Sequence, residues 1–449
     1  MNYLNAIKGF IKKKISSQFI RNLGWLGLAE ICYRILRLGL VVIIARYLSR
    51  YDYGLGAIIL TVREFAITFS DVGIGAKIIQ ASEKELPLLC GSAFWLNWLV
   101  FASLFMIQAI VAFPIAWFYQ SKDIIFPIIV TGIAYLIWPI YGIQKTLIQR
   151  ENRFKVIAFT DTIQYSISSI LTAIFAVMGM GVWAFALPVV IVAPLEVIIY
   201  YRNHSWRPRN GFTTLYWDEI LNFGKNILGV GLLKSLRNNL DYLIVGRFVG
   251  IEELGIYFFG FNAGLGISLS IINAIRSVML PHLCGARTEW LEFQHRYLHS
   301  IRTIAFIIVP FVLFQSSLAN IYVPIIFGNQ WIPAIPILIL ICLSAIPRPF
   351  ADAASQLLIA VGKPHLDLRW NVIFTSLFAG SLIIGVKTEV IATNFFGANA
   401  INNLTLILGE NWKVIGIALS VLLVHMIFLP LFTIWATRYV FPKKLQKGL

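Results

Sequence analysis

Two stretches of the chain, IIARYLSRYDYGL at 43–55 and IVGRFVGIEELGI at 244–256, follow nearly the same pattern. Each apolar run ends in an arginine and an aromatic residue, crosses a short polar turn and resumes at a glycine. The arginines Arg46 and Arg247 lie 201 residues apart (247 − 46 = 201), as do Gly54 and Gly255. A helix–turn–helix corner that recurs at this distance indicates two copies of one structural unit.

The composition predicts the class of protein. The 449 residues are 58% hydrophobic and only 13% charged, whereas soluble domains average about 25% charged residues. Many apolar runs reach the roughly 20 residues that a membrane-spanning helix needs. The runs are continuous, which favours helices over the alternating strands of a β-barrel. We therefore expect an all-α, polytopic integral membrane protein.

The apolar runs predict about twelve transmembrane helices. The candidate spans are 25–47, 54–76, 88–113, 124–145, 156–178, 182–201, 221–247, 255–280, 301–326, 333–360, 368–386 and 413–436, with polar loops at 202–219 and 281–300. A second internal match pairs 146–163 with 356–373, and a weaker one pairs 181–186 with 414–419. A six-helix unit keeps its orientation when it is duplicated, so we expect two pseudo-symmetric six-helix bundles around a central cavity.

The chain is thus expected to have five parts in order. They are an amphipathic cytoplasmic segment 1–21, an N-lobe 22–201, a cytoplasmic connector 202–219, a C-lobe 220–437 with an extracytoplasmic loop 387–412, and a basic cytoplasmic tail 438–449. Lysine and arginine concentrate in alternate loops, which places both termini in the cytoplasm. This topological role accounts for the net charge of +16 better than a nucleic-acid partner, and we expect none. The four cysteines have no CxxC spacing, and neither a metal site nor another cofactor is predicted.

Several charged residues fall inside the predicted spans, where each costs about 2.5–3.5 kcal/mol and usually faces a cavity or a partner. The cations are Arg34, Arg37, Arg63, Lys234, Arg237 and Arg348, and the carboxylates are Glu64, Asp71, Asp241 and Asp352. Asp161 and Glu196 lie nearer the ends of their spans. Arg34 and Arg37 share one helix face, as do Lys234, Arg237 and Asp241.

Because cations outnumber carboxylates, we expect a cationic cavity for an anionic ligand, with arginines suited to phosphate or pyrophosphate. The alternative for Arg237 with Asp241 and for Arg348 with Asp352 is an interhelical ion pair that holds the bundle. The carboxylates, Asp161 included, are also candidates for coupling to H⁺ or Na⁺. That hypothesis is the weaker one, because a carboxylate beside an arginine tends to stay ionised.

The corner ARYLSRYDYGLGAI, its echo DYLIVGRFVGIEELGIYFF and the segment QRENRFK resemble the Wzx-type flippases. These form the polysaccharide-export branch of the multidrug/oligosaccharidyl-lipid/polysaccharide (MOP) superfamily. The family corner maps onto Arg46, the pair Tyr47-Leu48, Asp52 and Tyr53-Gly54, and the resemblance covers nearly the whole chain. The sequence departs from the family where Ser49-Arg50 replaces the usual Gly-Pro, and the loop 387–412 is unusually long.

The resemblance implies a transporter, not an enzyme, in the bacterial cytoplasmic membrane. Its substrate would be an undecaprenyl-pyrophosphate-linked glycan, carried to the outer leaflet by alternating access while its tail stays among membrane lipids. The pathway would make O-antigen, capsule or exopolysaccharide. Polysaccharide polymerase and chain-length proteins are candidate partners.

Three other functions are alternatives to the flippase. A small-molecule or drug exporter of the same superfamily would suit an acidic cavity better than a basic one. A membrane-embedded polymerase, ligase or glycosyltransferase would need a positioned base or nucleophile, and the sequence has no DxD, GxSxG or metal-ligand cluster. A lipid-binding scaffold would not need charges at mid-membrane.

Overall fold

The structure, a computed structural model, describes residues 39–70, 72–208, 211–284, 289–387 and 412–442. Across these ranges the regular structure is helical, without a strand. The chain divides into two compact units, and the division falls between Asn239 and Leu240. We call them unit 1 and unit 2. The helix α10 (Trp217–Phe248) begins in the first and ends in the second.

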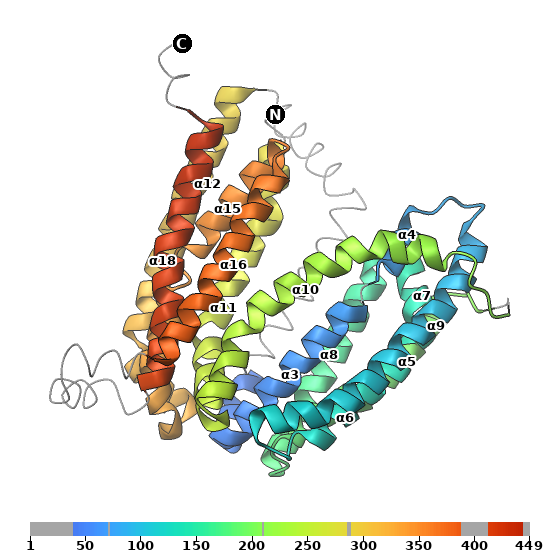
Figure 1. The fold of residues 1–449 in the computed structure, drawn as a ribbon, viewed down its shortest axis with the longest axis horizontal. Helices are drawn as coiled ribbons and strands as arrows, with labels where there is room; N and C mark the ends of the chain where they lie inside the picture. Colours follow the sequence, from blue (N-terminus) through green and yellow to red (C-terminus); the bar gives the residue numbers. More distant parts are fainter. Residues whose placement is uncertain (1–38, 71, 209–210, 285–288, 388–411, 443–449) are drawn as a thin grey trace, which may run out of the picture. The chain divides into compact units, whose positions relative to one another are not determined.

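Unit 1 is a bundle of antiparallel helices (Figure 1). Before α10 it contains α3 (Arg50–Ser70), α4 (Ile74–Gln80), α5 (Leu86–Tyr119), α6 (Ile125–Ile133), a 3₁₀ turn (Ala134–Leu136), α7 (Trp138–Arg150), α8 (Phe154–Val177) and α9 (Trp183–Asn203). α8 packs against α9, α5 against α6, and α7 against both α5 and α9. Its core at one end is built from small and branched apolar side chains around Ile78, Leu89 and Ile143.

Unit 2 follows a similar plan. It contains α11 (Ile251–Cys284), α12 (Trp290–Ser317), α13 (Ala319–Tyr322), a π turn (Val323–Phe327), a 3₁₀ turn (Asn329–Ala334), α14 (Ile335–Leu343), α15 (Arg348–Ala360), α16 (Pro364–Val386) and α18 (Trp412–Val440). α16 and α18 lie side by side (Figure 1), and α11 packs against α14 and α15.

The helices are long and apolar enough for a multi-pass membrane protein. Six described helices meet the length and hydropathy of a membrane span, and the pair Ile125–Leu136 and Trp138–Arg150, bent by 52°, makes up to seven. Their exposed side chains are large and apolar, as a lipid-facing surface requires: Trp117 is 80% exposed and Phe306 84%. The count of twelve spans stays a prediction.

The first corner is a capped helix junction. The preceding helix ends at Tyr47, and α3 begins at Arg50. Ser49 is its N-cap: the Ser49 hydroxyl accepts from the Asp52 amide at 3.1 Å and donates to the Asp52 carboxylate at 2.6 Å. This reciprocal arrangement resembles a capping box, which satisfies backbone groups at the start of a helix. Ser49 therefore stabilises the corner where the resembling family has Gly-Pro.

The second corner repeats the backbone of the first. Leu48 N bonds Ile44 O and Val249 N bonds Val245 O, both at 2.9 Å. Tyr53 N bonds Ser49 O and Leu254 N bonds Gly250 O, both at 3.0 Å. All these pairs are 201 residues apart, for example 250 − 49 = 201. Gly250 has φ +147°, a value that favours glycine, and the Glu253 carboxylate lies against it as Asp52 lies by Ser49.

The match between 146–163 and 356–373 also corresponds to a repeated structure. α7 and α15 each have 13 residues. Both have proline as their second residue, in Trp138-Pro139 and Arg348-Pro349 (348 − 138 = 210). The turns that follow have the same backbone bonds 210 residues apart, such as Arg153 N to Ile148 O and Lys363 N to Leu358 O.

The predicted loop 281–300 is wrong in its extent. α11 continues to Cys284 and α12 already begins at Trp290, so most of that stretch is helical. Two of its polar residues lie on α12, where Arg296 pairs with Glu292 at 2.8 Å in i,i+4 spacing. The error arises because hydropathy predicts where a span meets water, whereas a helix continues beyond that point if its surface tolerates water. The predicted span 301–326 also has the wrong bounds, because α12 already ends at Ser317.

Candidate functional site

Some of the predicted charged side chains lie outside the residues that the structure describes. Arg34, Arg37 and Asp71 fall outside them, so their roles stay predictions. Arg63, Lys234 and Arg237 belong to unit 1, and Arg348 belongs to unit 2. The two groups are described separately below. The predicted cavity between two lobes stays a prediction.

Arg63 of α3 is half-buried, and its Nε is buried without a hydrogen-bond partner. Its charge acts on Tyr135 and on Glu196 of α9. Tyr135 is itself held in place, because its hydroxyl donates to Gln108 Oε1 at 2.8 Å and Gln108 Nε2 donates to Ile128 O at 2.6 Å. The guanidinium therefore lies near a fixed polar network, and its Nε is left as an unused donor.

On α10 the predicted polar face is uneven in exposure. Lys234 is exposed, Arg237 is half-buried and Asp241 is only 3% exposed. Asn239 lies between them and is buried; its Oδ1 accepts from the Thr61 hydroxyl of α3 at 3.3 Å. Glu64, the predicted neighbour of Arg63, is exposed on α3. The i, i+3, i+7 spacing thus predicted a common face but not which of its members would be buried.

Asp241 is the centre of a buried cluster in unit 2. Its carboxylate accepts from the Tyr257 hydroxyl at 2.8 Å and from the Tyr242 amide at 3.0 Å. The charge of Arg348 in α15 acts on Asp241, and Arg348 interacts more strongly with Asp241 than with its sequence neighbour Asp352. The i,i+4 spacing predicts that Arg348 pairs with Asp352 on its own helix. In the structure, Asp241 of α10 acts on Arg348 more strongly.

Arg348 retains donors that this cluster does not use. Its Nε is buried without a partner, and its terminal nitrogen reaches the Ser344 hydroxyl at only 3.4 Å. A buried cation of this kind is costly unless a partner arrives or a nearby charge compensates it. Arg63 and Arg348 thus share a property: each is a partly buried guanidinium with an orphaned Nε, which suits it to an anionic group.

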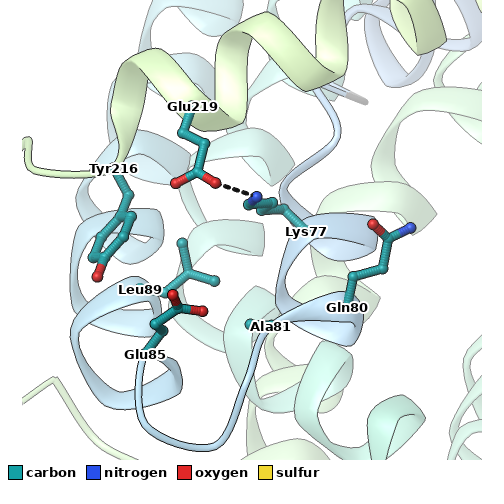
Figure 2. Close-up of a pocket in the computed structure, with 7 residues that line it drawn as sticks. All are labelled: Lys77, Gln80, Ala81, Glu85, Leu89, Tyr216 and Glu219. Atoms are coloured by element: carbon teal, nitrogen blue, oxygen red, sulfur yellow. Dashed lines mark hydrogen bonds and ion pairs between the residues drawn. The ribbon is translucent and has the colours of Figure 1, made fainter.

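A small polar pocket lies at one end of unit 1, between α4, α5 and the start of α10 (Figure 2). Its volume is about 150 Å³, and its lining includes Lys77, Glu85 and Tyr216. Lys77 forms an ion pair with Glu219 in the first turn of α10. The space is too small for an oligosaccharide. Its residues instead attach the beginning of α10 to unit 1.

The predicted connector is attached to unit 1 over much of its length. Trp95 Nε1 donates to Gly211 O at 3.1 Å, and Trp217 Nε1 donates to Ser92 O at 3.0 Å. Arg207 stacks on Tyr201 at 4.0 Å and donates to three backbone carbonyls of the 201–206 segment. Arg207 is thus satisfied by the protein itself and has a structural role in the connector.

The turn after α7 carries a second attachment. Glu151 pairs with Arg153 at 3.0 Å and with His204 at 3.2 Å, and Arg150 pairs with Glu83 at 2.7 Å. Burial alone would raise the pKa of Glu151, but the hydrogen bond from Arg153 and the attraction of His204 lower it below its ordinary value of 4.5. The turn is therefore held most firmly when Glu151 is ionised.

One polar cluster was missed as a unit by the sequence analysis. Tyr141 and Lys145 of α7, Asp161 of α8, and Glu196 and Tyr200 of α9 lie together in unit 1. The sequence places Asp161 and Glu196 near span ends and makes Asp161 a candidate for ion coupling, but it does not bring the two together. The available signal was the i,i+4 spacing of Tyr141 with Lys145 and of Glu196 with Tyr200, which puts each pair on one helix face.

Comparisons with known proteins identify the family of this chain. A sequence profile of the family described as "Polysaccharide biosynthesis protein" matches residues 43–336, which is more than half of the chain. The chain belongs to this family. The match begins at the first corner and extends to the start of α14, so it includes both copies of the corner. The resemblance seen in the sequence is confirmed.

Two curated relatives cover most of the chain. The teichuronic acid biosynthesis protein TuaB of Bacillus subtilis (strain 168) is 24% identical over 384 residues, which are 84% of this chain and 79% of the relative. The lipopolysaccharide biosynthesis protein WzxC of Escherichia coli (strain K12) is 24% identical over 377 residues, or 80% and 74% of the two chains. The protein is thus a membrane protein of polysaccharide biosynthesis.

Solved structures share the fold. An inward-facing multidrug resistance MATE family transporter of the MOP superfamily aligns over 93% of this chain and 96% of its own, with a TM-score of 0.66 and 12% identity. The lipid II flippase MurJ in an inward closed conformation aligns over 94% and 93%, with a TM-score of 0.66 and 13% identity. At these identities the likeness concerns the fold.

Proposed function

We propose that this protein is a flippase for a lipid-linked oligosaccharide. It moves an undecaprenyl-pyrophosphate-linked repeat unit from the cytoplasmic to the outer leaflet by alternating access, for the synthesis of a cell-surface polysaccharide. The observation that carries the proposal is its membership of the polysaccharide biosynthesis family, together with a fold shared with transporters and a lipid flippase.

The charge chemistry supports an anionic substrate. Arg63 and Arg348 are partly buried guanidiniums, each with a buried Nε that lacks a partner. Arginine presents a planar fork of donors that matches phosphate oxygens, and it stays charged at any physiological pH. A pyrophosphate supplies several such oxygens, and its binding at either guanidinium offsets the cost of burying that cation. A cationic drug would meet repulsion at the same groups.

The test is lipid analysis of a strain that lacks this protein. We expect a complete polyprenyl-pyrophosphate-linked repeat unit to accumulate at the inner leaflet while surface polysaccharide is lost. The accumulated lipid identifies the substrate. Normal lipid intermediates with unchanged surface glycan contradict the proposal and favour the small-molecule exporter.

Complementation then tests the arginines. Arg63→Ala is expected to lower export at least tenfold with unchanged membrane abundance, and Arg63→Lys to restore only part of it, because a lysine offers a point charge in place of a fork. Arg153→Ala, in a surface turn, is the matched control and should export normally. Arg34→Ala and Arg37→Ala are expected to abolish export; normal export by both, and by Arg63→Ala, removes the arginines from substrate binding.

A further inference from the structure

The segment 211–217, the last part of the connector before and into α10, is attached to α5 at both of its ends. Trp95 Nε1 of α5 donates to Gly211 O at 3.1 Å. Trp217 Nε1 donates to Ser92 O of α5 at 3.0 Å. Because these two bonds hold the segment against α5, the level of Ser92 and Trp95 in the membrane is also the level of the segment.

The tryptophans of α5 indicate that level. α5 is one of the described helices that are long and apolar enough to span a membrane, and it carries Trp95 toward its start and Trp117 near its end. Tryptophan is enriched at both boundaries of a bilayer. The two residues are separated by 117 − 95 = 22 positions, or about 33 Å of helix, which matches the roughly 30 Å of a hydrocarbon core. Trp95 therefore marks one membrane boundary, and the segment 211–217 lies at that boundary.

The segment exposes large apolar side chains at this level. Phe212 packs edge-on against Trp95 and Trp217, with both centroid distances at 5.7 Å, yet it is 68% exposed. Leu215 is 69% exposed in the turn that precedes α10. Its neighbour Tyr216 instead lines the small polar pocket of unit 1 (Figure 2). A turn that faces water is usually built from Gly, Pro, Asn, Asp or Ser, so a leucine here indicates an apolar environment.

The bilayer is the environment that this position supplies. A group of exposed apolar side chains marks a contact with a membrane or with another protein. The segment has the sequence GFTTLYW, without a charged residue, and the exposed Asp218 follows directly in the first turn of α10. The uncharged stretch is thus confined to the part of the connector that α5 holds at the boundary. No second protein is needed to cover Phe212 and Leu215, because lipid already surrounds α5 at this level.

We propose that the segment 211–217 is an interfacial membrane anchor, which inserts Phe212 and Leu215 between the lipids at this end of unit 1. By the predicted topology the leaflet is the cytoplasmic one. The partner is the region where lipid headgroups meet acyl chains, and because the segment carries no charge, insertion does not depend on anionic headgroups. The anchor keeps the connector in the plane of the membrane. Through Trp217 it also fixes the start of α10 at the boundary.

Fluorescence quenching with the full-length protein in phosphatidylcholine nanodiscs tests the anchor. Cys32→Ser and Cys284→Ser provide the background, and the other two cysteines are buried. Leu215→Cys then carries a fluorescent label, and Asp218→Cys, exposed and three residues on, is the matched control. A nitroxide on the lipid near the headgroup should quench the label at Leu215→Cys at least threefold more than the control. Iodide in the water should quench the two labels in the opposite order.

The opposite result overturns the proposal. A label at Leu215→Cys that iodide quenches and the lipid nitroxide does not would leave this apolar surface to a protein partner. Adding phosphatidylglycerol to the nanodiscs should change the lipid quenching by less than a third. Quenching that appears only with this anionic lipid contradicts an uncharged anchor.

A second set of variants keeps the test independent of the label at Leu215. Thr214→Cys, at an exposed position of the same segment, carries the label instead. Leu215→Asp should lower its quenching by the lipid nitroxide at least twofold, because a carboxylate resists insertion, and Leu215→Ile should leave it unchanged. An unchanged melting temperature in detergent shows that Leu215→Asp still folds. Equal lipid quenching in both variants contradicts the anchor, whatever the substrate of the protein.

Discussion

α7 of unit 1 and α15 of unit 2 have the same length and lead into the same turn, but they carry different chemistry. At the first residue of the helix, unit 1 has Trp138 and unit 2 has Arg348. Two turns on, unit 1 has Lys145 where unit 2 has Ser355. Unit 1 therefore carries its charge near the end of α7, whereas unit 2 carries its charge at the start of α15.

The buried acid of unit 2 has no counterpart in unit 1 either. Asp241 bonds Tyr257, and the positions 201 residues earlier are Leu40 and Gly56. Gly56 is needed there because a Cβ would lie 2.4 Å from the Phe185 ring. The repeat thus preserves turns and helix bounds, which depend on backbone hydrogen bonds. Buried charges diverge because packing tolerates them only where a partner or a ligand exists.

The largest expected effect comes from the close helix contacts that each unit makes with glycine. A Cβ on Gly224 of α10 would lie 1.8 Å from Val72 O in unit 1, and a Cβ on Gly385 of α16 would lie 3.0 Å from Gly416 O in unit 2. Gly224→Ala should destabilise the protein by about 3 kcal/mol or more and Gly385→Ala by about 1–3 kcal/mol. Thermal unfolding in detergent measures both.

Each glycine variant has a matched control. Gly229 of α10 and Gly380 of α16 have nothing within 4 Å of a built Cβ, so alanine there should change the melting temperature little. If Gly224→Ala behaves like Gly229→Ala, the close contact of α10 with Val72 is wrong.

The second prediction concerns the charge cluster peculiar to unit 2. Asp241→Asn keeps an acceptor for Tyr257 but removes the anion that acts on Arg348, and we expect a loss of about 2–3 kcal/mol. The double variant with Arg348→Met should recover much of this stability, because no buried cation remains. It should still fail to export, because Arg348 is proposed to bind substrate. Additive losses in the double variant contradict the interaction.

The third prediction tests whether the two corners contribute equally to the stability of the protein. Asp52→Ala removes the carboxylate that accepts from the Ser49 cap, and Glu253→Ala removes the carboxylate that lies against Gly250. Each should cost about 0.5–2 kcal/mol, the range for the loss of a capping interaction. Ser49→Gly should cost only a few tenths of a kcal/mol. Clearly unequal losses for Asp52→Ala and Glu253→Ala show that the corners share a sequence pattern but not an energetic role.

The smallest effect concerns the turn after α7, which in unit 2 has Val361 in place of Glu151. The lowered pKa of Glu151 means that its ion pairs stabilise the protein above the ordinary pKa of 4.5 and lose that contribution as the pH falls through the lowered value. Glu151→Gln should therefore lower stability slightly at neutral pH and not in strong acid. Melting curves from neutral to acidic pH measure this, with Glu83→Gln compared under the same conditions. A difference that grows in acid contradicts the assignment.

From the amino-acid sequence we predicted the membrane class, the approximate positions of many of the described helices and the repeated turns. Continuous apolar runs predict spanning helices wherever they occur, and a repeated pattern such as Arg46 to Gly54 predicts a repeated turn, because caps and turns depend on neighbours in the chain. The family resemblance followed from the same local motifs.

Which charges lie close enough to interact depends on how the helices pack. Arg348 interacts more strongly with Asp241 of α10 than with Asp352 four residues away, and Asp161 joins Glu196 and Lys145 across three helices. Spacing along one helix predicts a shared face, but partners on other helices depend on how the bundle packs. The proximity of these three charges therefore became visible only when α7, α8 and α9 were seen together.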